Sequence, residues 1–124
     1  MSRIRPWVPV ALYAGLVFWL SSQSRPLPFL PDEIWSFDKL LHAIEYAVLG
    51  LLLARALRAS GFSPARAFLG ALLVGSLYGA SDELHQSFVP NRTCDPRDWA
   101  ADTVGVALGA GALRQRKARA SIRA

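Results

Sequence analysis

The stretch LLHAIEYAVLGLLLARAL, residues 40–57, is apolar along nearly its whole length and is long enough for about five turns of α-helix. Three further apolar stretches flank it, at residues 6–22, 65–81 and 99–113. A helix needs about 20 mostly apolar residues to span a membrane, with about 17 as the lower limit. We therefore predict an all-α bundle of four transmembrane helices at residues 6–22, 40–57, 65–86 and 98–113, followed by a basic tail at residues 114–124.

The composition favours a membrane protein. The chain has 124 residues, of which 52% are hydrophobic and only 19% are charged, against about 25% charged in an average soluble domain. This composition excludes a disordered chain, and the single cysteine excludes an internal disulfide framework. Two alternatives stay open: residues 6–22 are a cleaved signal peptide, or the chain is a small soluble all-helical protein.

The charges separate to two sides if all four stretches cross a membrane. One side holds ten basic residues and no acidic one: Arg3, Arg5, Arg55, Arg58, Arg66, Arg114, Arg116, Lys117, Arg119 and Arg123. The other side has four basic residues, and all nine acidic residues lie there or in the adjoining helix halves. Cytoplasmic loops are rich in Lys and Arg, so both termini are predicted to be cytoplasmic. The basic tail is expected to contact anionic membrane lipid and no nucleic acid, because no aromatic or structured patch accompanies it.

Polar residues recur at helical spacing within the apolar stretches. Asp38, His42 and Tyr46 are spaced i, i+4, i+8. The same spacing places Asp82 with Gln86, beside Glu83, on the third helix, and Asp98 with Asp102 on the fourth. Small residues continue these two faces: Ala71, Gly75 and Gly79 on the third helix, and Ala101, Gly105 and Gly109 on the fourth. Because small residues let membrane helices approach closely, the acids are predicted to face one another in an outward-opening pocket, and a homodimer is allowed as well.

Ionisable groups at membrane depth are costly, at about 2.5–3.5 kcal/mol each, so several of these acids need partners. Lys39, Arg92 and Arg97 are the cations available on that side. The alternative that stays open is a purely structural one, in which the polar residues form hydrogen bonds between helices and have no further role.

The segments FDKLLHAIEYAVLGLLL, residues 37–53, and YGASDELHQSFVPNRTCDPRDWAADTVGVALG, residues 78–109, together resemble the VanZ-like family of small membrane proteins. The motifs that carry the resemblance are D-K-x-x-H-x-x-x-Y and D-E-x-x-Q-x-F-x-P-x-R. The matching positions are Asp38, Lys39, His42, Tyr46, Asp82, Glu83, Gln86, Pro90, Arg92, Asp98 and Gly105. The family usually has Asn where this chain has Asp102. The resemblance implies a single domain over residues 1–124, a multi-pass protein of the bacterial cytoplasmic membrane, and a role like that in glycopeptide resistance.

The sequence leaves two functions open. In the first, the acidic pocket binds or protects a cell-envelope component, such as an envelope lipid, a cell-wall precursor or a cationic antibiotic. The ligand-binding residues would be Arg92, Gln86, Tyr46, Asp98, Asp102 and Lys39. In the second, the chain is a membrane-embedded hydrolase or transferase acting on a lipid-linked or cell-wall precursor. Its catalytic residues would be Glu83, Asp82, His42 and Asp38.

In that enzyme, Glu83 or Asp82 would be the general base, and His42, oriented by Asp38, would move the proton. A variant of this enzyme would hold a divalent ion on Asp, Glu and His. It is disfavoured because the motifs contain no compact ligand pair such as H-E-x-x-H, so neither a metal nor another cofactor is predicted. Proton movement through the bundle is disfavoured, because the inner halves of the spans carry no acid.

Overall fold

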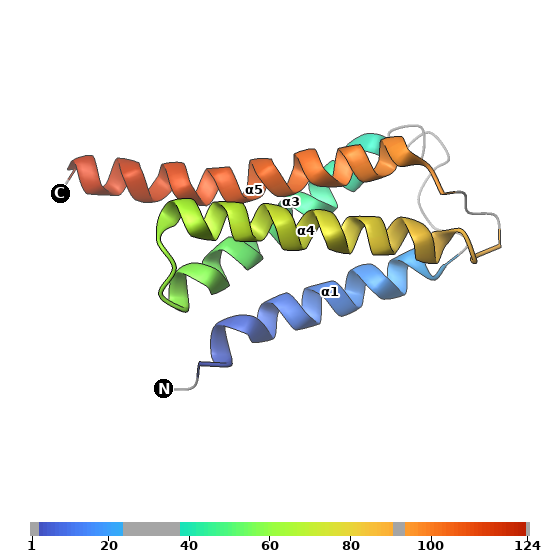
Figure 1. Ribbon diagram of the computed structural model, residues 1–124, viewed down its shortest axis with the longest axis horizontal. Coiled ribbons are helices and arrows are strands. Elements are labelled where there is room, and N and C mark those ends of the chain that lie inside the picture. The colour runs from blue at the N-terminus through green and yellow to red at the C-terminus, as the bar shows by residue number, and fades with distance from the viewer. Residues whose placement is uncertain (1–2, 24–37, 91–93, 124) are drawn as a thin grey trace.

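The computed structural model describes residues 3–23, 38–90 and 94–123, and this part of the chain contains helices and no strand. A 3-10 turn, η1 (Arg5–Trp7), leads into α1 (Val8–Ser21). Three longer helices follow: α3 (Asp38–Ala59), α4 (Pro64–Gln86) and α5 (Pro96–Arg123). Figure 1 shows the two ends of the chain and the α3–α4 turn at the same end of the bundle. The all-helical prediction is confirmed.

The turn between α3 and α4 is built from local signals. Gly61 has a φ of 100°, a conformation that glycine adopts without strain. The N–H of Phe62 donates to the carbonyl of Leu57 at 3.1 Å, which satisfies a free carbonyl at the end of α3. The hydroxyl of Ser63 then accepts from the N–H of Arg66 and caps α4. The chain therefore reverses within a few residues, and α3 and α4 are antiparallel neighbours.

Glycines set the distance between α3 and α5, the helix pair with the most extensive contact. A β-carbon on Gly105 would overlap the main-chain oxygen of Ala43, and a β-carbon on Gly109 would overlap that of Ala47. Neither overlap can be relieved by turning a side chain, because the obstructing atoms belong to the backbone of α3. The predicted small-residue face of this helix is thus its contact with α3.

The helix α4 joins this pair through a second small face. Ala71, Gly75 and Gly79 are all buried, and a β-carbon on Gly75 would lie 2.7 Å from both methyl groups of Val106 on α5. The apolar core consists of Val17, Tyr46, Leu49, Leu53, Ala54, Ala71, Val106 and Ala110. This apolar core occupies the centre of the bundle. The side chains at the ends of α3, α4 and α5 are therefore not part of it.

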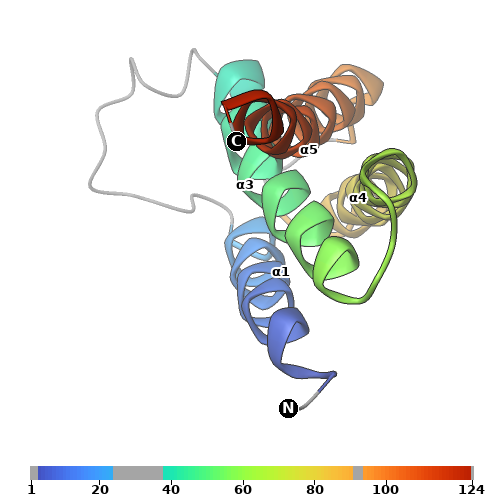
Figure 2. The same cartoon turned by 90° about the vertical axis from the view of Figure 1, so that its left-hand side faces the viewer.

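The helix α1 packs on α3 and, to a smaller extent, on α4. Figure 2 shows α3 lying between α1 and α5. Two tyrosine hydroxyls attach α1 to its neighbours: Tyr13 donates to the carbonyl of Glu45 at 2.6 Å, and Tyr78 donates to the carbonyl of Ala14 at 2.5 Å. Hydrogen bonds of this kind fix the depth at which α1 sits against α3 and α4.

The helices differ from the predicted ones mainly at the carboxyl end. The helix α5 continues to Arg123, so the predicted basic tail is helical over most of its length. Within the described ranges, one helix is both long and apolar enough to cross a membrane on its own, α3 over Lys39–Ala59.

Candidate functional site

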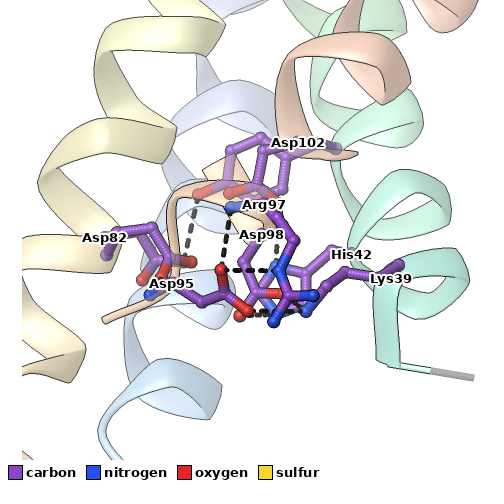
Figure 3. Close-up of polar contacts among 9 residues, drawn as sticks. Lys39, His42, Asp82, Asp95, Arg97, Asp98 and Asp102 are labelled. Carbon is purple, nitrogen blue, oxygen red and sulfur yellow. Dashed lines mark hydrogen bonds and ion pairs between the residues drawn. The ribbon is translucent and has the colours of Figure 1, made fainter. Parts of the chain in front are cut away.

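Five buried polar side chains from three helices meet at the end of the bundle opposite the α3–α4 turn. They are His42 on α3, Asp82 and Glu83 on α4, and Asp98 and Asp102 on α5. We call this set the acidic cluster; Figure 3 shows His42, Asp82, Asp98 and Asp102 converging there. The sequence predicted that the acids face one another, and in the structure these residues lie together. The close contacts at the glycines of α5 place its first turns against α3 and α4.

The closest pair in the cluster joins His42 and Asp102. Nδ1 of His42 lies 2.8 Å from Oδ1 of Asp102, whose side chain is fully buried. The other ring nitrogen, Nε2, lies 3.9 Å from Oδ2 of Asp98. The side chain of Asp102 has room between the helices because the residue facing it on α4 is Gly79. A β-carbon at Gly79 would lie 3.1 Å from the Asp102 β-carbon. A carboxylate that accepts from one ring nitrogen fixes the tautomer and the orientation of the imidazole.

The two acids of α4 are held by neutral donors. The hydroxyl of Tyr46 donates to Oδ2 of Asp82 at 3.2 Å, and the backbone N–H of Asp95 donates to Oε2 of Glu83 at 3.2 Å. Asp82 is 6% exposed and Glu83 is 3% exposed. Within the described part of the chain, neither carboxylate bonds a lysine or an arginine, and a ring nitrogen of His42 lies within 4.8 Å of an oxygen of Glu83.

The edge of the cluster carries two exposed cations and a half-buried aspartate, and we call Lys39, Asp95 and Arg97 the rim. Lys39 bridges Asp98 of the cluster and Asp95, its Nζ lying 3.2 Å from Oδ2 of Asp95. Asp95 also accepts from Arg97, through the backbone N–H at 2.9 Å and through Nε at 3.3 Å. The backbone N–H of Arg97, with the Arg97 and Lys39 side chains, lowers the pKa of Asp95 to about 2. The rim aspartate is therefore ionised at every physiological pH.

Two carboxylate oxygens inside the cluster lack a hydrogen-bond partner among the described residues: Oε1 of Glu83 and Oδ2 of Asp102. Both are inaccessible to solvent. Buried polar atoms without a partner are uncommon in folded proteins and each one needs an explanation. These two atoms mark the part of the cluster where hydrogen bonds of the described residues leave carboxylate oxygens unsatisfied.

The structure brings together most of the residues that the sequence marked as functional. Tyr46 and Gln86 are also buried at this end, and Lys39 lies at the rim. The side chain of Asp38 and the whole of Arg92 lie outside the described residues, as do the side chains of residues 117–123. The orientation of His42 by Asp38 therefore remains a prediction, whereas its contact with Asp102 is observed.

Sequence reasoning missed Asp95. This residue caps α5, bonds Lys39 and Arg97, and donates its backbone N–H to Glu83. The signal was present in the order Asp95, Pro96, because aspartate is a favoured N-cap and proline a favoured first helical residue. An N-cap assignment at Asp95 would have placed it beside Asp98, one turn further along α5.

The fold and the site define a small helical protein built around a buried cluster of acids and one histidine. The model of the VanZ/LLP1 family matches residues 5–117, and the chain belongs to this family. The resemblance found from the sequence motifs is confirmed. No curated protein and no solved structure matches the chain.

Proposed function

We propose that this chain is a multi-pass membrane protein that binds a positively charged group of a cell-envelope component in its acidic cluster, and so captures or shields that component. The observation that carries the proposal is the charge of the cluster. Asp82 and Glu83 are buried and contact only neutral donors among the described residues. One oxygen of Asp82 lies within 4.8 Å of one oxygen of Glu83, and two ionised groups at about that separation repel by about 3 kcal/mol at an effective dielectric constant of about 20. A bound cation would remove this repulsion.

The distribution of apolar side chains supports a membrane setting. The large apolar side chains that are between 61% and 71% exposed on three of the helices are Leu12, Leu69, Leu73, Leu77, Leu84 and Leu108. At the same time, acids and a histidine are buried. A soluble protein has the opposite arrangement, whereas ionisable residues inside a membrane bundle face its interior. This supports a bundle in which α1, α4 and α5 cross the membrane along with α3.

The two ends of the bundle support an orientation. Arg55, Arg58 and Arg66 lie around the α3–α4 turn, at the same end as both chain ends, and the acidic cluster lies at the other end. The positive-inside rule places the basic end in the cytoplasm. The acidic cluster would then open toward the outside of a bacterial cytoplasmic membrane, where envelope components are found.

The single cysteine offers a direct test of this orientation. Cys94 is exposed between α4 and α5, at the acidic end. We expect a membrane-impermeant maleimide to label Cys94 in intact cells. In the matched variant Cys94→Ser, Ser60→Cys, the cysteine moves to the α3–α4 turn, and we expect labelling only after permeabilisation. Labelling of both positions in intact cells, or only of Ser60→Cys, would contradict the proposed orientation.

The ligand proposal is tested with two lipids that differ only in a cationic group, lysyl-phosphatidylglycerol and phosphatidylglycerol. For the purified chain in detergent, we expect about 10- to 100-fold tighter binding of the lysyl lipid, because charge-assisted hydrogen bonds are worth about 1.5–3 kcal/mol. We expect Glu83→Gln to lose this preference. Asp95→Asn should keep it, since Asp95 is already paired with Lys39 and Arg97. Equal binding of the two lipids by the wild-type protein would refute a cation-selective site.

One observation favours the enzymatic alternative as a second candidate. His42 and Asp102, 2.8 Å apart, form an oriented carboxylate–imidazole pair of the kind used in general base catalysis. Hydrolysis of a lipid-linked or cell-wall precursor by the purified protein, lost in His42→Ala and kept in Asp95→Asn, would establish this alternative in place of a binding role.

A further inference from the structure

Three carboxylates of the acidic cluster share one arrangement. Asp82, Glu83 and Asp102 are 6%, 3% and 0% exposed, and each uses one oxygen to accept a hydrogen bond. The donors are the hydroxyl of Tyr46 for Asp82, the backbone N–H of Asp95 for Glu83, and the ring of His42 for Asp102. Each carboxylate is therefore held in place through one oxygen, while its second oxygen is left for another partner.

The second oxygens have no partner that the described residues provide. Oε1 of Glu83 and Oδ2 of Asp102 are buried without a hydrogen bond, and no described bond uses Oδ1 of Asp82. One oxygen from each of the three carboxylates lies within 4.8 Å of the others. Burial makes unpaired charges costly, so ionised carboxylates at this separation would be stabilised by a counter-charge between them.

We propose that Asp82, Glu83 and Asp102 bind a divalent cation that prefers oxygen ligands: Mg²⁺, Mn²⁺ or Ca²⁺. Three carboxylates are the donor set that such ions favour, and ligand distances of about 2.0–2.6 Å let a single ion reach oxygens separated by up to about twice that length. Tyr46, the backbone of Asp95 and His42 would be the outer contacts that orient the ligands, as hydrogen-bond donors do around metal sites generally.

A second group of donors, His42, Glu83 and Asp98, also lies within 4.8 Å. The all-oxygen group is preferred because the two unpartnered atoms belong to Glu83 and Asp102. In the other group, Asp98 is already paired with Lys39, and Nδ1 of His42 is engaged by Asp102. No contiguous motif encodes the chosen group, since its ligands come from one turn of α4 and from α5, about twenty residues further along the chain.

The inference goes beyond the proposed function, because an ion can reside in the cluster whether or not an envelope component binds. A divalent ion would neutralise two of the three inner charges. Asp98, which the ion would not use, lies between this site and Lys39 of the rim. A cationic group of an envelope component could therefore bind at the edge of a cluster that already holds its ion.

The test is a titration of the purified full-length chain with Mn²⁺, after treatment with a chelator and its removal, followed by the electron paramagnetic resonance signal of free Mn²⁺. We expect one saturable site per chain. Glu83→Gln and Asp102→Asn should each weaken it by about 100-fold or more, and Tyr46→Phe by about 10- to 100-fold, the effect of losing an outer contact. Asp95→Asn keeps the backbone donor and should bind as the wild type does. Competition with Mg²⁺ and Ca²⁺ then ranks the ions.

A wild-type protein that is folded by circular dichroism and binds no Mn²⁺, Mg²⁺ or Ca²⁺ at millimolar concentration would overturn the inference. Equal binding by the wild type and Glu83→Gln would do so too. The lipid experiment is independent: a protein that binds Mn²⁺ but shows no preference for the lysyl lipid would refute the proposed function alone. Lysyl-lipid selectivity without Mn²⁺ binding would refute the metal site alone.

Discussion

Replacing Gly105 with valine is expected to destabilise this chain severely. A β-carbon at this position would overlap the main-chain oxygen of Ala43 and lie 3.0 Å from the Ala43 α-carbon. Overpacking against mobile side chains costs about 1–3 kcal/mol. Here the obstacle is backbone, so α3 and α5 must move apart along their most extensive contact, and we expect a loss at or above the top of that range. Since total stabilities are only about 5–15 kcal/mol, such a loss is a large part of the total, and the yield of folded protein should fall sharply.

The measurement is the yield of monodisperse protein in detergent, followed by thermal denaturation. The matched control is Gly15→Val, on the exposed face of α1, where a β-carbon would have no neighbour within 4 Å. We expect that variant to express and melt close to the wild type. A Gly105→Val protein that purifies and melts within a few degrees of the wild type would show that α3 and α5 do not pack at this distance.

The close contact at Gly105 also illustrates what the sequence could predict. Ala101, Gly105 and Gly109 recur at intervals of four, and this spacing alone identifies a helix face that a neighbour approaches closely. The same periodicity placed Asp98 and Asp102 on that face, so their burial could be inferred. Helical spacing is a local property, and it reports reliably on which residues share a face.

The spacing does not predict which neighbouring helix packs against that face. The orientation of His42 by Asp38, one turn earlier on its own helix, remains a prediction, and spacing gave no indication of the partner that is observed, Asp102 on α5, sixty residues away. This partner depends on the register between α3 and α5, which is set by contacts such as that of Gly105 with Ala43. The role of Asp95 was missed for a similar reason, because its N–H reaches Glu83 only through the fold.

The extent of the helices shows a second limit. Apolarity predicted the end of the last helix near residue 113, but α5 continues to Arg123. Arg and Lys are good helix formers and favour the carboxyl end of a helix, where they complement its dipole. A hydropathy pattern marks where a helix could be buried in lipid, and backbone propensity allows the helix to continue past that point.

Replacing His42 with alanine is expected to lower the free energy of unfolding by about 3 kcal/mol, because it leaves the buried carboxylate of Asp102 without its hydrogen-bond donor. His42 is 7% exposed and Asp102 is 0% exposed, so water cannot readily replace the lost contact with Oδ1 of Asp102. The measurement is equilibrium unfolding in mixed detergent, in the presence of a chelator so that no metal ion contributes. The control is Arg97→Ala, which removes an exposed partner of Asp95 and should cost about 0–1 kcal/mol.

The double variant His42→Ala, Asp102→Asn separates the two causes of that loss. If the loss comes from a buried carboxylate without its donor, removing the charge should recover a large part of it, and the two substitutions should be non-additive by about 0.5–3 kcal/mol. If the loss comes from the cavity left by the imidazole, Asp102→Asn should recover nothing. Recovery would show that Asp102 carries a charge which the fold must neutralise, and that the same carboxylate is available to a cation when one is present. A His42→Ala protein as stable as the wild type would contradict the buried pair itself.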